Sequence, residues 1–81
     1  MENYWQKFDE LIDLLKKDNK HHVVDELKDA QLYVNGLTDG WYNFMEAYDN
    51  IIKFRKQELT EHQLNISSVL SKKLKDWLSD R

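Results

Sequence analysis

The clearest structural signal in the sequence is the stretch Leu59-Thr60-Glu61-His62-Gln63-Leu64. Thr60 and Gln63 have the spacing of a capping box, in which the threonine hydroxyl bonds the Gln63 amide and the glutamine side chain returns the bond. Leu59 and Leu64 occupy the two positions of a hydrophobic staple, which sets the angle at which the chain enters a helix. The stretch therefore predicts that a helix begins here, and we expect it to cover residues 61–78.

Three more helices are predicted upstream, because apolar residues recur there at steps of three and four. We place these helices at residues 2–17, 20–34 and 41–58. Their apolar stripes are Tyr4, Phe8, Leu11 and Leu15 in the first, Val23, Leu27, Ala30 and Val34 in the second, and Trp41, Phe44, Tyr48, Ile51 and Ile52 in the third.

The breaks between these helices differ in clarity. Both glycines lie in residues 35–40, where Gly36 suits the left-handed conformation after a helix end and Thr38 or Asp39 is expected to cap the third helix. Between the first two helices there is only a polar stretch, in which Asp18 or Asn19 is a candidate cap for the second helix. The apolar phase across this stretch also fits one continuous helix.

Length and composition favour one small all-α domain over residues 1–81. The chain is 41% hydrophobic and 33% charged, which is apolar enough for a core and too polar for a membrane protein. Four short amphipathic helices with short connections predict an antiparallel bundle. No secretory signal is visible at the N-terminus and no apolar run is long enough to span a bilayer, so we expect a cytoplasmic protein.

Nothing in the sequence indicates catalysis, and we expect neither an enzyme nor a cofactor. Cysteine is absent, and so are the common nucleophile, phosphate-loop and zinc-protease motifs. His21, His22 and His62 each have a carboxylate four positions away, but such pairs are ordinary on helix surfaces and no four-ligand set is visible. We therefore expect no metal site.

Charge is distributed unevenly along the chain. Residues 1–50 hold eleven acidic and five basic residues, a net charge of −6, and residues 51–81 hold four acidic and seven basic residues, a net charge of +3. The two halves either neutralise each other within the bundle or leave an acidic patch for a basic partner. The candidate partner-binding residues are Asp25, Glu26, Asp29, Asp39, Glu46 and Asp49, with Trp41 or Tyr42 as an exposed aromatic anchor. The alternative for the aromatic rings is that they fill the core.

Several segments carry a resemblance to small all-helical bacterial proteins of the immunity-protein type. They are the runs Leu11–Leu15 and Leu27–Ala30, then Gly36, then the run from Gly40 to Tyr48. In size, acidity and helical content the chain also resembles the nuclease-colicin immunity proteins, which bind a basic toxin through an acidic helical face. The chain contains no proline and so lacks the tyrosine-tyrosine-proline segment of that family. Tyr33 and Tyr42 are therefore not assigned the roles of those tyrosines.

The resulting hypothesis is a non-enzymatic protein that neutralises a basic toxin domain by covering it. Two alternatives remain open. In the first, the aromatic surplus completes the core of a homodimer. In the second, the basic residues near the C-terminus contact nucleic acid, although the net charge of −3 disfavours this.

Overall fold

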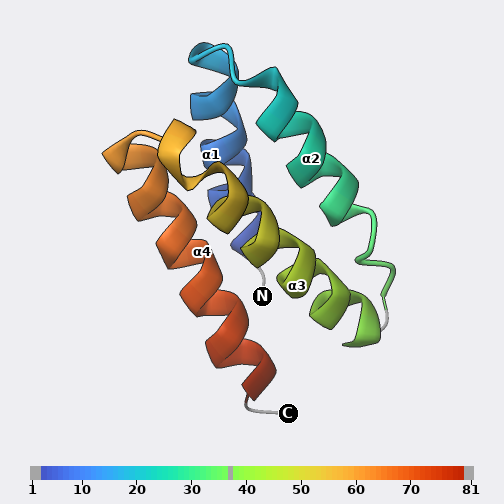
Figure 1. The fold of residues 1–81 in the computed structure, drawn as a ribbon. Coiled ribbons are helices and arrows are strands. Elements are labelled where there is room, and N and C mark those ends of the chain that lie inside the picture. Colours follow the sequence, from blue (N-terminus) through green and yellow to red (C-terminus); the bar gives the residue numbers. More distant parts are fainter. Residues whose placement is uncertain (1–2, 37, 80–81) are drawn as a thin grey trace.

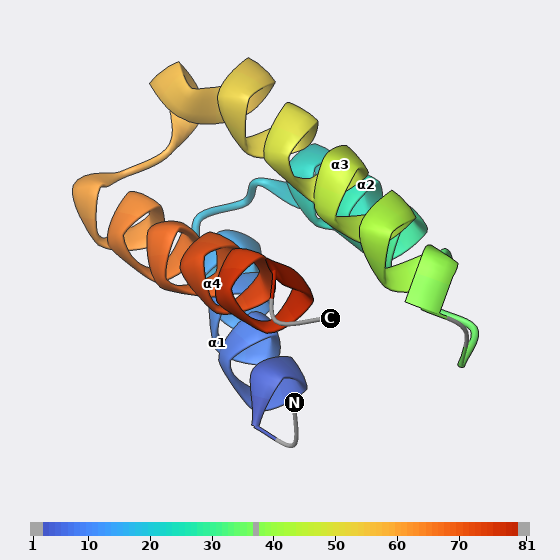
Figure 2. The ribbon, with the colours of Figure 1, turned by 90° about the horizontal axis from the view of Figure 1, so that it is seen from below.

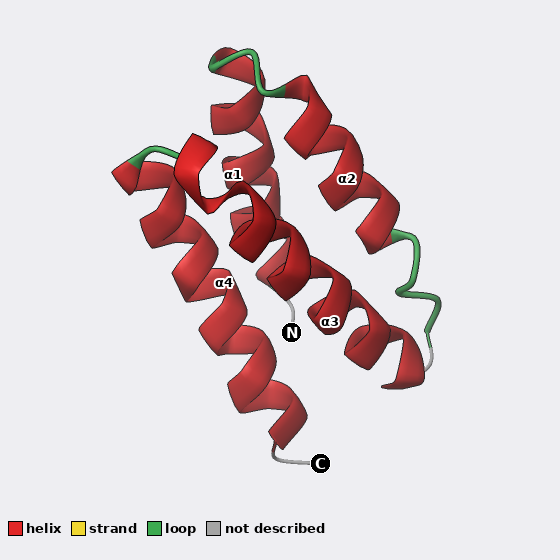
Figure 3. Cartoon of the chain, viewed as in Figure 1, coloured by secondary structure: helices red, strands yellow, loops and turns green. Residues whose placement is uncertain are grey.

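A computed structural model describes residues 3–36 and 38–79, and the regular elements in this part of the chain are all helices, with no strand (Figure 3). The elements are α1 (Tyr4–Lys17), α2 (His21–Gln31), α3 (Thr38–Arg55), a short 3-10 helix η1 (Lys56–Glu58) and α4 (Glu61–Ser79). The predicted all-α fold of four helices is confirmed.

Consecutive helices run in opposite directions and pack against each other, and α4 closes the arrangement by packing on α1 (Figure 1). Seen from below, α2 and α3 form one layer and α1 and α4 form the other (Figure 2). Each helix of α1–α4 thus has two neighbours. This arrangement buries the apolar stripes that short helices cannot shield alone.

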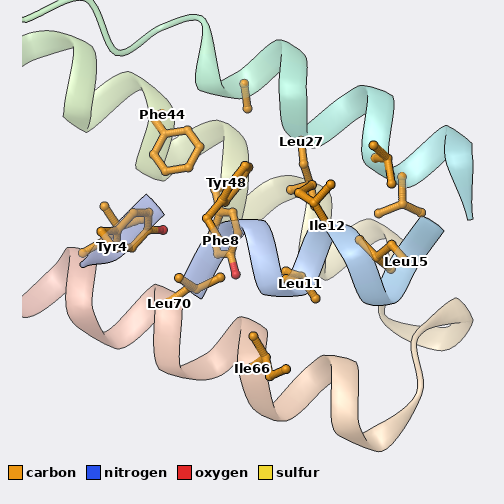
Figure 4. Packing of buried hydrophobic residues seen from close by; sticks show 14 of the residues in the cluster. Tyr4, Phe8, Leu11, Ile12, Leu15, Leu27, Phe44, Tyr48, Ile66 and Leu70 are labelled. Carbon is orange, nitrogen blue, oxygen red and sulfur yellow. The ribbon is translucent and has the colours of Figure 1, made fainter. Parts of the chain in front are cut away.

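The core contains or contacts the stripes predicted for the first three helices, together with Ile66, Leu70 and Leu74 of α4 (Figure 4). Phe8, Leu11, Leu27, Phe44 and Leu70 are completely buried. The predicted stripes therefore line the interior. Among the described residues, the large apolar side chains that stay exposed are Leu32, Tyr33, Tyr42, Phe54 and Val69.

An aromatic cluster closes one end of the core. Trp41 stacks on Trp5 with ring centroids 5.3 Å apart and meets Trp77 edge-on at 5.2 Å. Tyr4 and Phe44 contact the same cluster. Aromatic rings in such geometries add to the free energy of burial, so this end of the bundle is held by three helices at once.

α1 and α2 are separate helices, joined by a tight turn at Asn19. Asn19 takes a left-handed backbone conformation with φ of 59°, which asparagine tolerates better than most residues. The amide of Lys20 bonds the carbonyl of Leu15 at 2.9 Å and the amide of Asn19 bonds that of Lys16 at 3.1 Å, the pattern of a Schellman motif. The predicted cap for α2 was wrong, because Asn19 terminates α1 and α2 begins after Lys20 without a side-chain cap.

The connection between α2 and α3 also departs from the prediction. α2 ends at Gln31, because the next amides bond carbonyls three residues back and tighten the last turn. α3 begins at Thr38, three residues before the predicted start at Trp41, so Thr38 and Asp39 lie in its first turn. The predicted capping bond rests on residues outside the described part of the chain and stays a prediction. Gly36 has the expected positive φ, at 91°, but lies in the loop rather than directly after the helix.

The predicted start of α4 is confirmed by both bonds of the capping box. The Gln63 amide donates to Thr60 Oγ1 at 3.1 Å, and the Thr60 amide donates to Gln63 Oε1 at 3.0 Å. Gln63 is buried and also bonds the distant α1–α2 turn, since Lys20 Nζ donates to Oε1 at 2.9 Å and Nε2 donates to Asp18 Oδ2 at 3.2 Å. One side chain therefore caps α4 and fastens it to the far turn.

No helix in residues 3–36 and 38–79 has both the length and the hydropathy that a bilayer-spanning segment needs.

Candidate functional site

α3 separates two surfaces of opposite charge. Steps of three and four residues place Asn43, Glu46, Ala47 and Asn50 on the side facing α2. The other side faces α4 and carries Asp49 and Lys53 together with Tyr48 and Ile52, and Lys56 of η1 lies on the same side. Neighbours in sequence such as Asp49 and Asn50 therefore belong to different surfaces.

The α2–α3 groove is the candidate site. It consists of two adjoining hollows of about 360 and 270 Å³ that share Tyr33 and Ala47. The residues that line it are Glu26, Asp29, Ala30, Tyr33, Asn43, Glu46, Ala47, Asn50 and Ile51. Three of these residues are acidic and none is basic, so the groove presents negative charge beside a mixed apolar and amide floor.

Tyr33 is the exposed aromatic residue of this groove, with 52% of its surface accessible. Its position depends on Gly40, which is buried in the first turn of α3. A Cβ atom at Gly40 would lie 2.3 Å from the carbonyl oxygen of Tyr33 and 2.9 Å from Asn35 Oδ1. The absence of a side chain at Gly40 therefore lets the end of the α2 segment pack directly on α3, with the Tyr33 ring over the groove.

The acidic residues of the groove differ in whether they form ion pairs within the described part of the chain. Arg55 bonds both carboxylate oxygens of Glu26, at 2.9 and 2.8 Å, and these hydrogen bonds lower the pKa of Glu26. Asp29 and Glu46 have no ion-pair partner in the described part of the chain. The charge available to a partner therefore comes mainly from Asp29 and Glu46.

The other predicted acidic residues lie at different places on the surface, outside the α2–α3 groove. Asp25 and Asp39 are exposed but do not line the groove. Asp49 lies on the α4 side, where it accepts a hydrogen bond from Ser71 at 3.0 Å and lies 3.6 Å from Lys75 Nζ. The predicted patch is therefore not one surface, and the two halves of the chain neutralise each other only in part.

Neither predicted aromatic anchor lies at the groove. Trp41 packs into the aromatic cluster at the end of the core, which makes the core interpretation the right one for this ring. Tyr42 is 41% exposed but lies on the α4 side, where its hydroxyl donates to the carbonyl of Leu78 at 3.1 Å. Tyr33 was not among the candidate residues, although its position off the apolar stripe of the second helix was a usable signal.

The histidines do not form a metal centre with their neighbours. His22 Nε2 lies 2.6 Å from Glu58 Oε1, and this bond is the largest cause of the lowered pKa of Glu58. In residues 3–36 and 38–79, no three His, Asp or Glu side chains gather closely enough to hold a metal ion.

Comparison of the chain with protein-family models, with curated protein sequences and with solved structures gave no match.

Proposed function

We propose that the protein binds a basic protein partner through the α2–α3 groove and acts by covering that partner's surface, in the manner of an immunity protein that neutralises a basic toxin domain. The observation that carries this proposal is the half-exposed ring of Tyr33, which lines one hollow with Asp29 and the other with Glu46, on a groove whose described lining holds no basic residue. The bacterial immunity-type resemblance of the sequence supports the choice of a toxin as partner.

Two parts of the groove have different physical roles in this proposal. Unpaired carboxylates attract a basic partner and orient it during approach, which affects the association rate more than the final affinity. Tyrosine is enriched among the residues that dominate binding energy, because its ring buries a large area and its hydroxyl can still bond water or a partner. Asp29 and Glu46 are thus expected to control association, and Tyr33 to control dissociation.

The test begins with capture of the partner from native lysate by the tagged protein, alongside co-expression with the product of the neighbouring reading frame. Association with the captured partner is then measured at low and high salt for the variant Asp29→Lys/Glu46→Lys. We expect association at least about tenfold slower at low salt, with the difference shrinking as salt screens the charges. Tyr33→Ala should instead accelerate dissociation by about tenfold, the effect of losing about 1.4 kcal/mol.

A matched control is Asp13→Lys/Asp76→Lys, which changes the net charge equally at two exposed positions outside the groove. This control should keep most of the wild-type association rate. Equal slowing by the two double variants would show that net charge alone matters and would remove the groove from the proposal. If the captured partner proves to be a toxin, cells that co-express it with the wild-type protein should survive, and cells with the groove variant should not.

The homodimer alternative cannot draw on Trp5, Trp41 and Trp77, which pack on one another within one chain, although Tyr33, Tyr42 and Phe54 stay exposed. Sedimentation of the purified protein at micromolar concentration separates the two ideas, since a tight dimer would favour the alternative.

A further inference from the structure

A second groove, between α3 and α4, plays no part in the proposed function. It has a volume of about 400 Å³, which lies within the range of small-molecule pockets. It is lined by Tyr48, Asp49, Ile52, Lys53, Lys56, Leu64, Ser67, Ser68, Ser71 and Lys75. We call it the α3–α4 groove.

The charge of this groove is opposite to that of the protein as a whole. Lys53, Lys56 and Lys75 line it, and Asp49 is its one acidic residue, so its net charge is +2 in a chain of net charge −3. In the described part of the chain, neither Lys53 nor Lys56 has an ion-pair partner. Positive charge in the last turn of α3 also complements the helix dipole, and this would explain Lys53. The helix dipole does not explain why α4 adds serines and Lys75 to the same groove.

Donors on the α4 side of the groove already bind a carboxylate of the protein itself, that of Asp49. The carboxylate of Asp49 accepts a hydrogen bond from Ser71 Oγ at 3.0 Å, and its other oxygen lies 3.6 Å from Lys75 Nζ. A hydroxyl and an ammonium group from α4 therefore point toward an oxygen anion supplied by α3. Lys53, Lys56 and the exposed Ser68 offer the same kinds of donor, and Lys53 and Lys56 have no ion-pair partner in residues 3–36 and 38–79.

We propose that the α3–α4 groove binds the phosphate group of a small phosphorylated molecule. In this proposal Lys53 and Lys56 supply positive charge and Ser68 supplies a hydroxyl donor. The ammonium group of Lys75 would bind the phosphate in place of the Asp49 carboxylate that it now faces. The half-buried side chains of Ile52 and Leu64 provide an apolar floor for the rest of the molecule. The same phosphate chemistry occurs in a nucleic-acid backbone, but a hollow of this size between two helices fits a compact ligand better than an extended strand.

The test is titration of the full-length protein with inorganic pyrophosphate at constant ionic strength, followed by calorimetry and by backbone-amide NMR. Saturable binding is expected, with shifts concentrated at residues 49–56 and 67–75. Lys53→Gln/Lys56→Gln should weaken it by about tenfold or more, as expected for the loss of charge-assisted bonds. The matched control is Lys72→Gln/Lys73→Gln, which removes two exposed lysines of α4 that do not line the groove.

Asp49→Asn provides a test in the opposite direction. It removes the carboxylate that competes for Ser71 and Lys75, so pyrophosphate should bind several-fold more tightly, whereas a merely structural role for Asp49 predicts no gain. Equal weakening by the two lysine double variants, or the absence of saturable binding in both the wild-type protein and Asp49→Asn, would overturn the proposal. So would binding of a single-stranded oligonucleotide without binding of pyrophosphate or a sugar phosphate. None of these outcomes depends on the α2–α3 groove.

Discussion

Arg55 donates two parallel hydrogen bonds to Glu26, from Nε to Oε1 at 2.9 Å and from Nη2 to Oε2 at 2.8 Å. Its third nitrogen bonds Glu58 at 2.9 Å, and Glu58 in turn bonds His22. This network joins the first half of α2 to the end of α3. The two-pronged pair satisfies the charges of Arg55 and Glu26 locally, so neither side chain is fully available to a partner.

The first prediction concerns acid stability. Hydrogen bonds from Arg55 and His22 lower the pKa values of Glu26 and Glu58 in the folded protein. Their stabilising contribution is therefore complete above the unfolded-state pKa of about 4.3 and is lost as the pH falls below it. Glu26→Gln should lower the melting temperature at pH 7. Between about pH 5 and 3 the melting temperature of this variant should then fall less than that of the wild type.

Thermal melts followed by circular dichroism across this pH range provide the measurement. Glu46→Gln is the control, since Glu46 has no ion-pair partner in the described residues and the change should leave the acid-dependent drop close to that of the wild type. Identical pH profiles for Glu26→Gln and the wild type would contradict the stabilising role of the pair.

The second prediction separates the two roles of Gln63. Glutamate serves as well as glutamine in a capping box. In this fold, however, Gln63→Glu would place a carboxylate where the amide nitrogen now donates to Asp18. We expect Gln63→Glu to lower stability despite an intact cap, and Thr60→Ala to lower it by about 1 kcal/mol through loss of the cap. Chemical denaturation measures both, and the double variant Asp18→Asn/Gln63→Glu should recover most of the loss if repulsion is the cause.

The third prediction compares two buried tyrosines. The hydroxyl of Tyr48 donates to the carbonyl of Ser67 at 2.8 Å, whereas the buried hydroxyl of Tyr4 has no hydrogen-bond partner among the residues that the structure describes. Burial raises the pKa of both phenols, so both stay neutral and each must satisfy one O–H group. Tyr48→Phe should cost about 1 kcal/mol of unfolding free energy, and Tyr4→Phe should be neutral or stabilising. A larger loss for Tyr4→Phe than for Tyr48→Phe in denaturant melts would show that the Tyr4 hydroxyl is satisfied in solution.

The fourth prediction distinguishes the two glycines. Gly40→Ala would force a Cβ atom against the Tyr33 carbonyl, so we expect a loss of about 1–3 kcal/mol, typical of overpacking. Gly36 has open space around it but a φ of 91°, so Gly36→Ala should cost about 1 kcal/mol through backbone strain alone. Because Gly40 also positions Tyr33, Gly40→Ala should change the fluorescence or NMR signals of Tyr33, and Gly36→Ala should not change the packing of α3.

Although only the structure separated α1 from α2, the sequence by itself determined the apolar faces of the helices and the start of α4. These features depend on residues three or four positions apart, which meet within a single helix whatever the rest of the chain does. The Thr60–Gln63 capping box and the stripe from Tyr4 to Leu15 are local in this sense and were predicted correctly.

The tertiary structure alone decided which polar residues act together. Glu46 and Asp49 are three positions apart on one helix, yet packing of α3 between α2 and α4 assigns them to surfaces of opposite charge. Gly40 looked like a loop residue, and only the close approach of the Tyr33 carbonyl explains why a glycine is needed inside a helix. Contacts between residues far apart in the chain depend on how the helices are placed, and the spacing of residues along one helix carries no information about that placement.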